Sequence, residues 1–271
     1  MNPGFSRVWL IEIALCFAPL CFGQSALPNP ADLLKDARSR QEKMDAIREN
    51  YTFHRIVTTD ELDDRGAVTK STSEEHEVFF VNGHRIARLV KKNGIPLDAA
   101  AEKKEQERIR KRVEECLKQA PPPRRGAGTI AEILAVVKIS NPRRLTLNGR
   151  STLAYDFTGD PAAHGHDMEQ NAMKKTSGTL WFDEVDHQVA RLEVLFYDNF
   201  RIAGGLLANV QKGTSISLEQ SPVGDGLWMQ TASEQHVGVR VAFKKYRENE
   251  HARNFDFKKF DVTTQQQIVQ H

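Results

Sequence analysis

The chain has 271 residues, 39% of them hydrophobic and 27% charged, a composition typical of a folded protein with a buried core. Its formal net charge is only +2, and basic and acidic residues are interleaved along the sequence, which argues against a nucleic-acid-binding protein. The length fits one large domain, and we expect a monomer built mainly of antiparallel strands.

The first 25 residues are typical of a secretory signal peptide. Arg7 precedes the apolar run 8–22, and the small residues that follow predict cleavage after Gly23 or Ser25. The run is too short for a comfortable membrane span, and Glu12 interrupts it. We therefore expect a protein that is exported to the periplasm and is soluble there.

Cysteine usage excludes a fold held by disulfides. Cys16 and Cys21 would leave with the signal peptide, so the mature chain keeps only Cys116. Neither of the first two follows the small residue that is expected before a lipidated cysteine, which disfavours a lipoprotein. With no intramolecular disulfide, the fold must be stabilised by its hydrophobic core.

The folded domain is expected to begin with a helix and a three-stranded meander. Residues 29–50 open with an Asn-Pro pair and carry apolar residues roughly along one face, which favours a helix. The apolar period then changes to two, which predicts strands at 51–62, 68–81 and 85–91. Asn82-Gly83 separates the last two strands and favours a tight hairpin turn.

Residues 98–119 interrupt the strand pattern with a strongly charged helix, capped by Asp98 and ended by the prolines at 121–123. We interpret it as an inserted surface helix whose N-terminal half is solvated. An arm that binds a partner is the less favoured alternative. Its thin apolar stripe is limited to Ile109, Val113, Cys116 and Leu117.

A short apolar helix is expected at 129–137. Thr129–Glu132 matches a capping box, and apolar residues follow at helical spacing. A helix this short needs docking to be stable, so we hypothesise a lid on the concave face of the sheet that moves when a ligand enters. A permanently packed core helix is the open alternative. The lid residues would be Ile130, Ile133, Leu134 and Val137.

The strongest strand pattern lies at 177–198, where two antiparallel strands are expected around an acidic turn at 183–187. Another hairpin is expected across Asn148-Gly149. One face of the 177–198 pair is apolar in both strands, and we predict that it lines a cavity for acyl chains. The predicted cavity residues are Leu180, Phe182, Leu192, Val194 and Phe196.

More strands are expected towards the C-terminus, before a polar tail at 263–271. About ten antiparallel strands then follow one helix, with one or two helices inserted midway, and so long a sheet should curl. We therefore predict a single α+β domain at 26–262. Its sheet would be a strongly curved half-open β-barrel with helices as a lid on the concave face. The later strands are predicted near 200–203, 206–212, 215–220, 227–235, 237–247 and 253–260.

Motifs for catalysis and cofactor binding are missing from the sequence, and we expect that the protein is not an enzyme. The loop 164–167 offers His164 and His166 to a metal, but no third convergent ligand is apparent. Gly204-Gly205 lacks the spacing and the following helix of a phosphate-binding loop. We therefore predict no catalytic residue, no metal site and no cofactor.

The strings GTLWFD (178–183), RLEVLF (191–196), DGLWMQ (225–230) and NFDFKKF (254–260), in this element order, resemble the LolA/LolB-like superfamily of periplasmic proteins. The resemblance is to the branch of outer-membrane lipoprotein-sorting proteins. It implies a half-open β-barrel with a helical lid over a hydrophobic cavity that takes acyl chains of lipoproteins or lipids. The family's Arg-Pro-x-x-Phe-x-Trp stretch has no clear match here, and the charged helix at 98–119 is extra.

Two functions follow as hypotheses. The first is a periplasmic lipid- or lipoprotein-binding carrier, and the second is an envelope sensor or scaffold that binds a partner protein with the same fold. A large, dry apolar cavity would favour the first, whereas a filled barrel with an exposed apolar patch would favour the second.

Overall fold

The protein is described by a computed structural model of residues 27–122, 135–202, 207–224, 226–242 and 244–260. This part of the chain contains the helices α1 (Pro30–Arg48), α2 (Ala99–Lys118) and α4 (Met168–Met173). Its strands are β1 (Tyr51–Leu62), β2 (Val68–Val81), β3 (His84–Lys92), β4 (Ile95–Pro96), β5 (Val137–Leu147), β6 (Arg150–Gly159), β7 (Thr176–Asp183), β8 (Val189–Phe196), β9 (Phe200–Ile202), β10 (Ala208–Val210), β11 (Ser215–Gly224), β12 (Leu227–Val241) and β13 (Lys244–Lys259).

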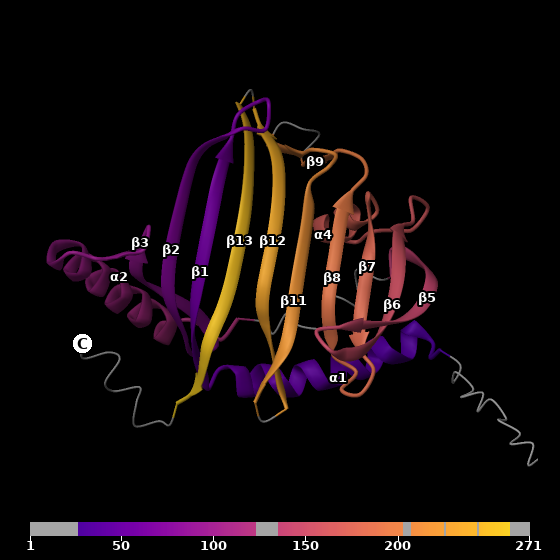
Figure 1. The fold of residues 1–271 in the computed structure, drawn as a ribbon, viewed down its shortest axis with the longest axis horizontal. Helices are drawn as coiled ribbons and strands as arrows, with labels where there is room; N and C mark the ends of the chain where they lie inside the picture. The colour runs from indigo at the N-terminus through magenta and orange to yellow at the C-terminus, as the bar shows by residue number, and fades with distance from the viewer. Residues whose placement is uncertain (1–26, 123–134, 203–206, 225, 243, 261–271) are drawn as a thin grey trace, which may run out of the picture.

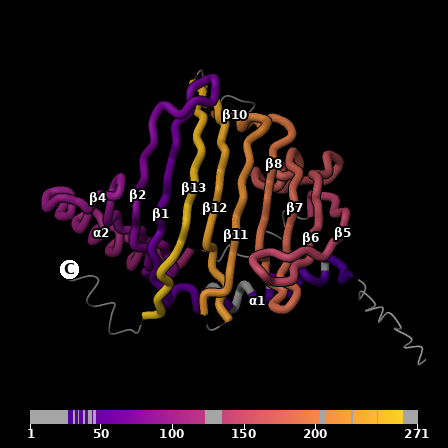
Figure 2. Tube along the Cα trace, viewed as in Figure 1, coloured from indigo at the N-terminus to yellow at the C-terminus, as the bar shows by residue number. Residues whose placement is uncertain are grey.

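All strands of the described chain belong to one antiparallel sheet. The order along it is β4-β3-β2-β1-β13-β12-β11-β8-β7-β6-β5, and the short β9 and β10 attach beside β12. The two ends of this order do not pair with each other, and Figures 1 and 2 show them at opposite sides of the curved sheet. The predicted fold class, a curved open barrel of the α+β type, is confirmed.

Local turn chemistry determines two of the hairpins. Asn82 (φ 50°) and Gly83 (φ 75°) connect β2 to β3, and Asn148 (φ 50°) and Gly149 (φ 77°) connect β5 to β6. Two successive residues with positive φ make the turn whose twist matches that of paired strands, and Asn-Gly adopts it with little strain. The two hairpins predicted from these dipeptides are confirmed.

The C-terminal part has fewer and longer strands than the sequence predicts. In place of three strands between residues 227 and 260 there are two, β12 and β13, which pair continuously from Ala232–Arg253 to Val241–Lys244. The prediction is wrong because polar residues interrupt the apolar alternation, whereas backbone hydrogen bonds to neighbours on both sides continue the strands. The predicted number of about ten strands is too low; the two-residue strand β4 was not predicted, whereas β9 and β10 lie within the strands predicted near 200–203 and 206–212.

Helix α1 crosses one face of the sheet near one end of its strands, from β6 towards β1 (Figure 1). Leu33 packs among residues of β6 and β7, and Met44 packs near the start of β1. We call the face that α1 covers the inner face. The helix predicted at 29–50 is confirmed at almost the predicted length.

Helix α2 packs on the outer face, at the β3 side of the sheet (Figure 1). Its contacts with β2 and β3 are made by residues that alternate with the inner-facing Val78 and Ala87. Leu117, predicted to pack, is 65% exposed, because it lies on the far side of the helix. The packed residues are Phe79, Ile86, Ile109, Val113 and the free cysteine Cys116.

Polar side chains of α2 also cover the edge of β3. Glu105 Oε1 accepts a hydrogen bond from the Leu89 backbone N–H at 2.8 Å. Arg108 Nη2 donates to the Ala87 carbonyl oxygen at 2.6 Å. These two bonds satisfy backbone groups that an edge strand would otherwise present to another chain. The charged helix is therefore part of the sheet's edge and not only a solvated insertion.

Candidate ligand-binding face of the sheet

The five predicted cavity residues share the inner face. Leu180 is 3% exposed and Phe182 is 0% exposed, both in one cluster that includes residues of α1. Leu192 packs at the margin of this cluster, and Val194 and Phe196 are buried further along β8. Beneath α1, this face is filled by side chains. We call this group the β7–β8 cluster; it consists of Leu33, Ala37, Leu153, Tyr155, Leu180, Phe182 and Val189.

A second apolar group lies on the inner face at the other end of α1. Its packing includes a tilted aromatic pair, Phe53 and Phe257, whose ring centroids are 5.4 Å apart. Met44 of α1 and Phe80 of β2 pack at its margin. We call it the β1–β2 cluster; it consists of Tyr51, Phe53, Val78, Leu227 and Met229.

Among the side chains of α1 that the structure describes, three apolar ones contact the two clusters. Leu33 and Ala37 are buried in the β7–β8 cluster, and Met44 is partly buried against the β1–β2 cluster. The rest of the helix is rich in charged residues, as its sequence DLLKDARSRQEKMDAIR shows. We call the two clusters together the apolar strip. Helix α1 lies across this strip, its sequence is mainly polar, and its three described apolar contacts are Leu33, Ala37 and Met44.

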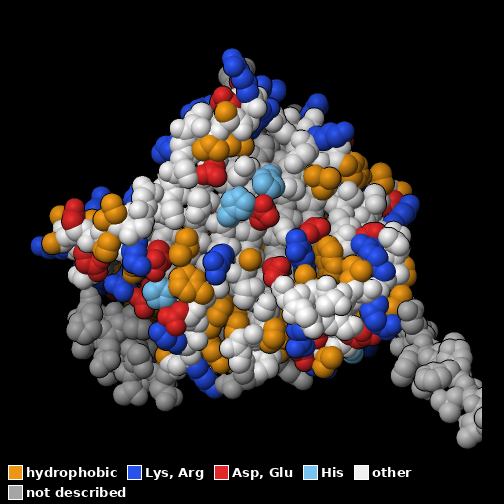
Figure 3. All heavy atoms as spheres, in the orientation of Figure 1, with side chains coloured by type: hydrophobic (Ala, Val, Ile, Leu, Met, Phe, Trp, Pro, Cys, Tyr) orange, Lys and Arg blue, Asp and Glu red, His pale blue; other side chains and the backbone are white. Residues whose placement is uncertain are grey.

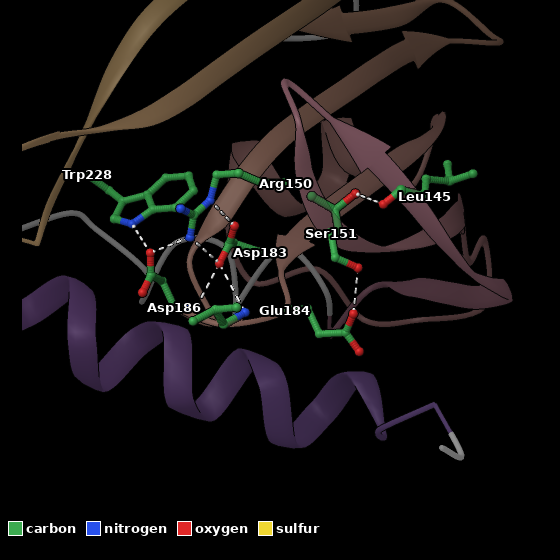
Figure 4. A network of polar contacts seen from close by, with 9 residues as sticks. Leu145, Arg150, Ser151, Asp183, Glu184, Asp186 and Trp228 are labelled. Atoms are coloured by element: carbon green, nitrogen blue, oxygen red, sulfur yellow. Dashed lines mark hydrogen bonds and ion pairs between the residues drawn. The ribbon is translucent and has the colours of Figure 1, made fainter. Parts of the chain in front are cut away.

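A polar network positions the β7–β8 turn above α1 (Figure 4). Arg150 donates to both carboxylate oxygens of Asp183, with Nε–Oδ2 2.5 Å and Nη2–Oδ1 2.9 Å, and to Asp186 Oδ2 at 2.8 Å. Trp228 Nε1 donates to the same Asp186 oxygen at 3.1 Å. The Arg150 guanidinium also lies 5.4 Å from the Trp228 ring centroid. The network thus links the turn to β6 and to β12.

The Asp183 carboxylate is ionised and fully partnered. Its side chain is 1% exposed, and burial by itself would raise its pKa. Hydrogen bonds from Arg150 and from the backbone N–H groups of Val185 and Asp186 outweigh burial and hold the pKa below its usual value. With its lone pairs occupied, Asp183 is suited to fixing the turn and not to proton transfer.

The inner face becomes basic next to the β1–β2 cluster. Arg55 lies opposite His76 in the pairing of β1 with β2, and Arg85 lies opposite Phe80 in the pairing of β2 with β3. Arg85 is exposed, although partial desolvation by its neighbours lowers its pKa and the positive charge of Arg55 lowers it further. Burial also lowers the pKa of His76, which favours its neutral form. We call these three residues the inner basic group.

Sequence reasoning missed both Arg150 and the inner basic group. Strand alternation could have indicated the inner basic group. Arg55, His76 and Arg85 each lie two positions from an inner-facing apolar residue, and residues two apart in a strand share a face; the apolar residues are Phe53, Val78 and Ala87. The Asp183 and Asp186 side chains were interpreted as turn residues, which is correct, but nothing in the sequence indicates that an arginine of β6 reaches them.

The predicted lid falls largely outside the described residues. This applies to Ile130, Ile133 and Leu134. Val137 is the first residue of β5 and pairs with Gly159, so it is a strand residue and not part of a helix. That part of the prediction is wrong, because Val137 already belongs to the strand pairing of β5 with β6.

A hollow of about 600 Å³ lies over β6, β7, β8, β11 and β12. Ser177, Ser215, Ser217 and Glu193 line it. Along their strands these residues alternate with the inner-facing ones, so this part of the hollow's lining belongs to the outer face of the sheet. Among the predicted cavity residues, Val194 alone borders it. In the view of Figure 3, hydrophobic side chains form small groups among charged ones, not one wide apolar patch.

The described residues contain no cluster of three or more histidine, cysteine, aspartate or glutamate side chains that could hold a metal. His164 and His166 lie in the loop before α4, and Asp167 caps this helix by accepting a hydrogen bond from the Gln170 N–H at 2.8 Å. Within the described part of the chain, no helix is long and apolar enough to cross a membrane.

No protein-family model and no curated protein matches the chain. Among solved structures, the chain is similar to a domain described as an outer membrane lipoprotein-sorting protein from Vibrio parahaemolyticus, with 9% identity, TM-score 0.38, and 89% of this chain and 98% of that one covered. It is also similar to a LolA superfamily protein from Nitrosomonas europaea, with 14% identity, TM-score 0.32, and 83% and 94% covered. A third is a DUF1329 family protein from Desulfovibrio piger, with 11% identity, TM-score 0.34, and 87% and 95% covered.

Proposed function

We propose that the protein is a periplasmic carrier that holds the acyl chain of a lipid or lipoprotein against the inner face of its sheet. The observation that supports this proposal is the apolar strip made by the β7–β8 and β1–β2 clusters, which α1 covers with Leu33, Ala37 and Met44. Because the inner face beneath α1 is filled by side chains, the proposal requires that an acyl chain takes the place of part of α1 there.

The energies favour such an exchange. Burial of Leu33 contributes about 1.5–3 kcal/mol, and the half-buried Met44 and the small Ala37 contribute less, before the entropy of ordering is subtracted. A chain of about 15 methylenes buried at about 0.8 kcal/mol each would contribute about 12 kcal/mol before comparable costs. An acyl chain would therefore bury more apolar surface than these three side chains do.

Binding of a fluorescent fatty acid tests the proposal, with paired substitutions on one strand. Leu192→Arg places a charge on the inner face of β8, and we expect it to abolish uptake. Leu195→Arg is the matched control, because Leu195 lies on the opposite face of the same strand and is 45% exposed. Uptake by this control should remain within about twofold of the wild type.

Unchanged uptake by a folded Leu192→Arg variant would remove this face from the site. If the wild-type protein takes up no lipid at all, the carrier proposal fails and the scaffold hypothesis gains. The lid hypothesis for 129–137 has its own test, because lipid should change hydrogen exchange there if that segment moves on binding.

The carrier proposal also requires export. The N-terminal sequence pattern supports a mature chain that starts at Gln24 or Ala26. N-terminal sequencing of the periplasmic protein should recover one of these residues. Recovery of Met1 from a membrane fraction would contradict export by a cleaved signal.

A further inference from the structure

The sheet has an end that lies away from α1, where β9 and β10 adjoin the last part of β12 and the first part of β13 (Figure 1). Helix α1 reaches β12 near its start, since Arg48 Nη2 donates to the Trp228 carbonyl oxygen at 3.4 Å. The pairing of β12 with β13 finishes at the other end, with Val241 opposite Lys244. We call this region the distal end; it consists of β9, β10 and residues 239–241 and 244–247.

The inner face of the distal end is apolar across four strands. Side chains directly opposite each other on neighbouring strands share a face, so the pairing makes one row from β9 through β10 and β12 to β13. Three members of this row are half-buried, and the fourth, the tyrosine, is 40% exposed. We call it the distal apolar row; it consists of Phe200, Val210, Val239 and Tyr246.

The outer face of the same strands is basic. One residue further along each strand, the pairing makes a second row on the opposite face, which we call the distal basic row; it consists of Arg201, Asn209, Arg240 and Lys245. Its two arginines are exposed, and its lysine is 45% exposed. Figure 3 shows Lys and Arg side chains along the upper margin of the molecule, where these strands end. The distal end is therefore amphipathic.

Neighbouring acidic residues offset only part of this charge. Residues 238–247 contain four basic residues and no acidic one. From the turn between β1 and β2, Asp64 Oδ1 lies 3.7 Å from Lys245 Nζ, and the Asp64 carbonyl oxygen accepts a hydrogen bond from Arg247 Nη1 at 2.7 Å. Glu61 is occupied by Lys70, with 2.5 Å between Oε1 and Nζ.

Three other cations have no ion pair with a carboxylate of the described chain: Arg201, Arg240 and Lys244. Arg240 also lies directly opposite Lys245, and like charges in this arrangement repel each other. An anionic surface outside the protein would relieve this repulsion. The distal end thus combines accessible apolar side chains with unpaired positive charge.

We propose that the distal end docks on the surface of a membrane that contains anionic phospholipids. The distal apolar row, with the 44% exposed Val241 beyond it, enters the boundary between headgroups and acyl chains, where tyrosine is a frequent side chain. The distal basic row contacts the anionic headgroups. Lys244 Nζ lies 5.0 Å from the ring centroid of Tyr246, so a cation and an aromatic ring reach the interface together.

This docking goes beyond acyl binding and does not depend on it, because α1 and the side chains it covers lie towards the other end of the strands. A second copy of the chain is a poorer occupant of the distal end. A two-fold contact uses the same surface of both copies and would bring two basic rows together.

Sedimentation with lipid vesicles tests the docking. The mature protein is mixed with vesicles of phosphatidylglycerol and phosphatidylcholine, and separately with vesicles of phosphatidylcholine alone. We expect roughly tenfold or tighter binding to the anionic vesicles, since each basic side chain near such a surface contributes attraction. Added salt should weaken this binding, because it screens exposed charges.

Two double variants separate the rows. Arg240→Gln combined with Lys245→Gln should weaken binding to the anionic vesicles roughly 20-fold, or about fivefold for each cation. Val241→Ser combined with Tyr246→Ser should weaken it roughly fivefold and keep its dependence on salt, because the cations remain. Thermal melts that match the wild type would show that both variants fold.

The matched control removes the same charge elsewhere. Arg110→Gln combined with Lys111→Gln changes two positions of α2 whose side chains are 61% and 63% exposed. This control should bind the anionic vesicles as the wild type does. An equal loss in the control and in the variant of the distal basic row would show that net charge alone attracts the protein, and would overturn the distal end as the docking site.

The remaining outcomes also decide the proposal. Equal binding of the wild type to both kinds of vesicle, or to neither, would overturn the docking and leave acyl binding standing, which fatty-acid uptake tests separately. Self-association without vesicles that the Val241→Ser and Tyr246→Ser variant loses would assign the distal end to a second copy and overturn the membrane.

Discussion

At the β5–β8 flank of the sheet, α1 covers the inner face, whereas at the β1–β4 flank α2 covers the outer face and the edge strand. The first flank therefore has a dry inner face, with Phe182 at 0% exposure and the Arg150–Asp183 pair beside it. The second flank keeps its inner face partly polar, with Arg55, His76 and Arg85 next to the β1–β2 cluster.

The same difference extends to the two edges of the sheet. At β3, side chains of α2 bond to the edge backbone. At β5, a bulge between Ser140 and Arg143 breaks the pairing pattern, with Asn141 at φ 50° followed by Pro142. Both devices discourage edge-to-edge association. The β5–β8 flank therefore has a fully apolar inner face beneath α1, whereas the inner face of the β1–β4 flank combines an apolar cluster with basic side chains.

A substitution in the β5–β8 flank should cause the greatest loss of stability. Phe182→Ala should lower the free energy of unfolding by about 3–5 kcal/mol, because it leaves a cavity among fully packed side chains. Val57→Ala, at a half-buried inner position of β1, should cost about 1 kcal/mol or less. Urea denaturation of both variants measures the contrast, and similar losses would show that the two flanks are packed alike.

The polar network should give the next largest effect. Asp183→Asn removes the buried charge that holds Arg150, and we expect a loss of about 2–4 kcal/mol, since Arg150 is 37% exposed and can partly rehydrate. Asp186→Asn, at a 39% exposed site, should cost about 1 kcal/mol. Because the pKa of Asp183 is lowered by folding, its contribution is present above the unfolded-state pKa and is lost as the pH falls towards the folded-state pKa. Equal stability of the Asp183→Asn variant and the wild type at pH 7 would contradict a stabilising role.

At the opposite edge, Glu105→Ala should cost about 1–3 kcal/mol, because the Leu89 N–H and Arg108 lose their shared partner. The variant should also associate at high concentration, as seen by light scattering, since the β3 edge is uncovered. Glu107→Ala, which removes an exposed glutamate of the same helix, is the control. A monodisperse Glu105→Ala variant would mean that α2 protects this edge by packing alone.

The smallest effect is expected at Asp156 of β6. Hydrogen bonds from Arg143, Asn141 and Thr179 hold its pKa at about 2, below the usual aspartate value of 3.8. This stabilisation is complete above the unfolded-state pKa and disappears as the pH falls through the folded-state value. Because solvent screens this partly exposed ion pair, Asp156→Asn should lower the free energy of unfolding by only about 1 kcal/mol at pH 7. The difference from the wild type should shrink between pH 4 and pH 2, and a pH-independent difference would point to lost packing.

Local sequence alone was sufficient for much of the secondary structure. The Asn-Gly turns, the Asp98 cap of α2 and the alternation of Leu180 and Phe182 depend on residues close in the chain, and all three were predicted. The five predicted cavity residues share one face of the sheet, because strand alternation places them together. Whether that face takes an acyl chain stays a prediction.

Only the tertiary structure decided which segments meet. β1 pairs with β13 almost 200 residues away, α1 and α2 lie on opposite faces, and Arg150 reaches Asp183. Periodicity reports that a strand or helix has an apolar face, but not which other element covers it, because packing depends on surfaces brought together from distant parts of the chain. For the same reason the shared face of Arg55, His76 and Arg85 became visible only when three strands were placed side by side.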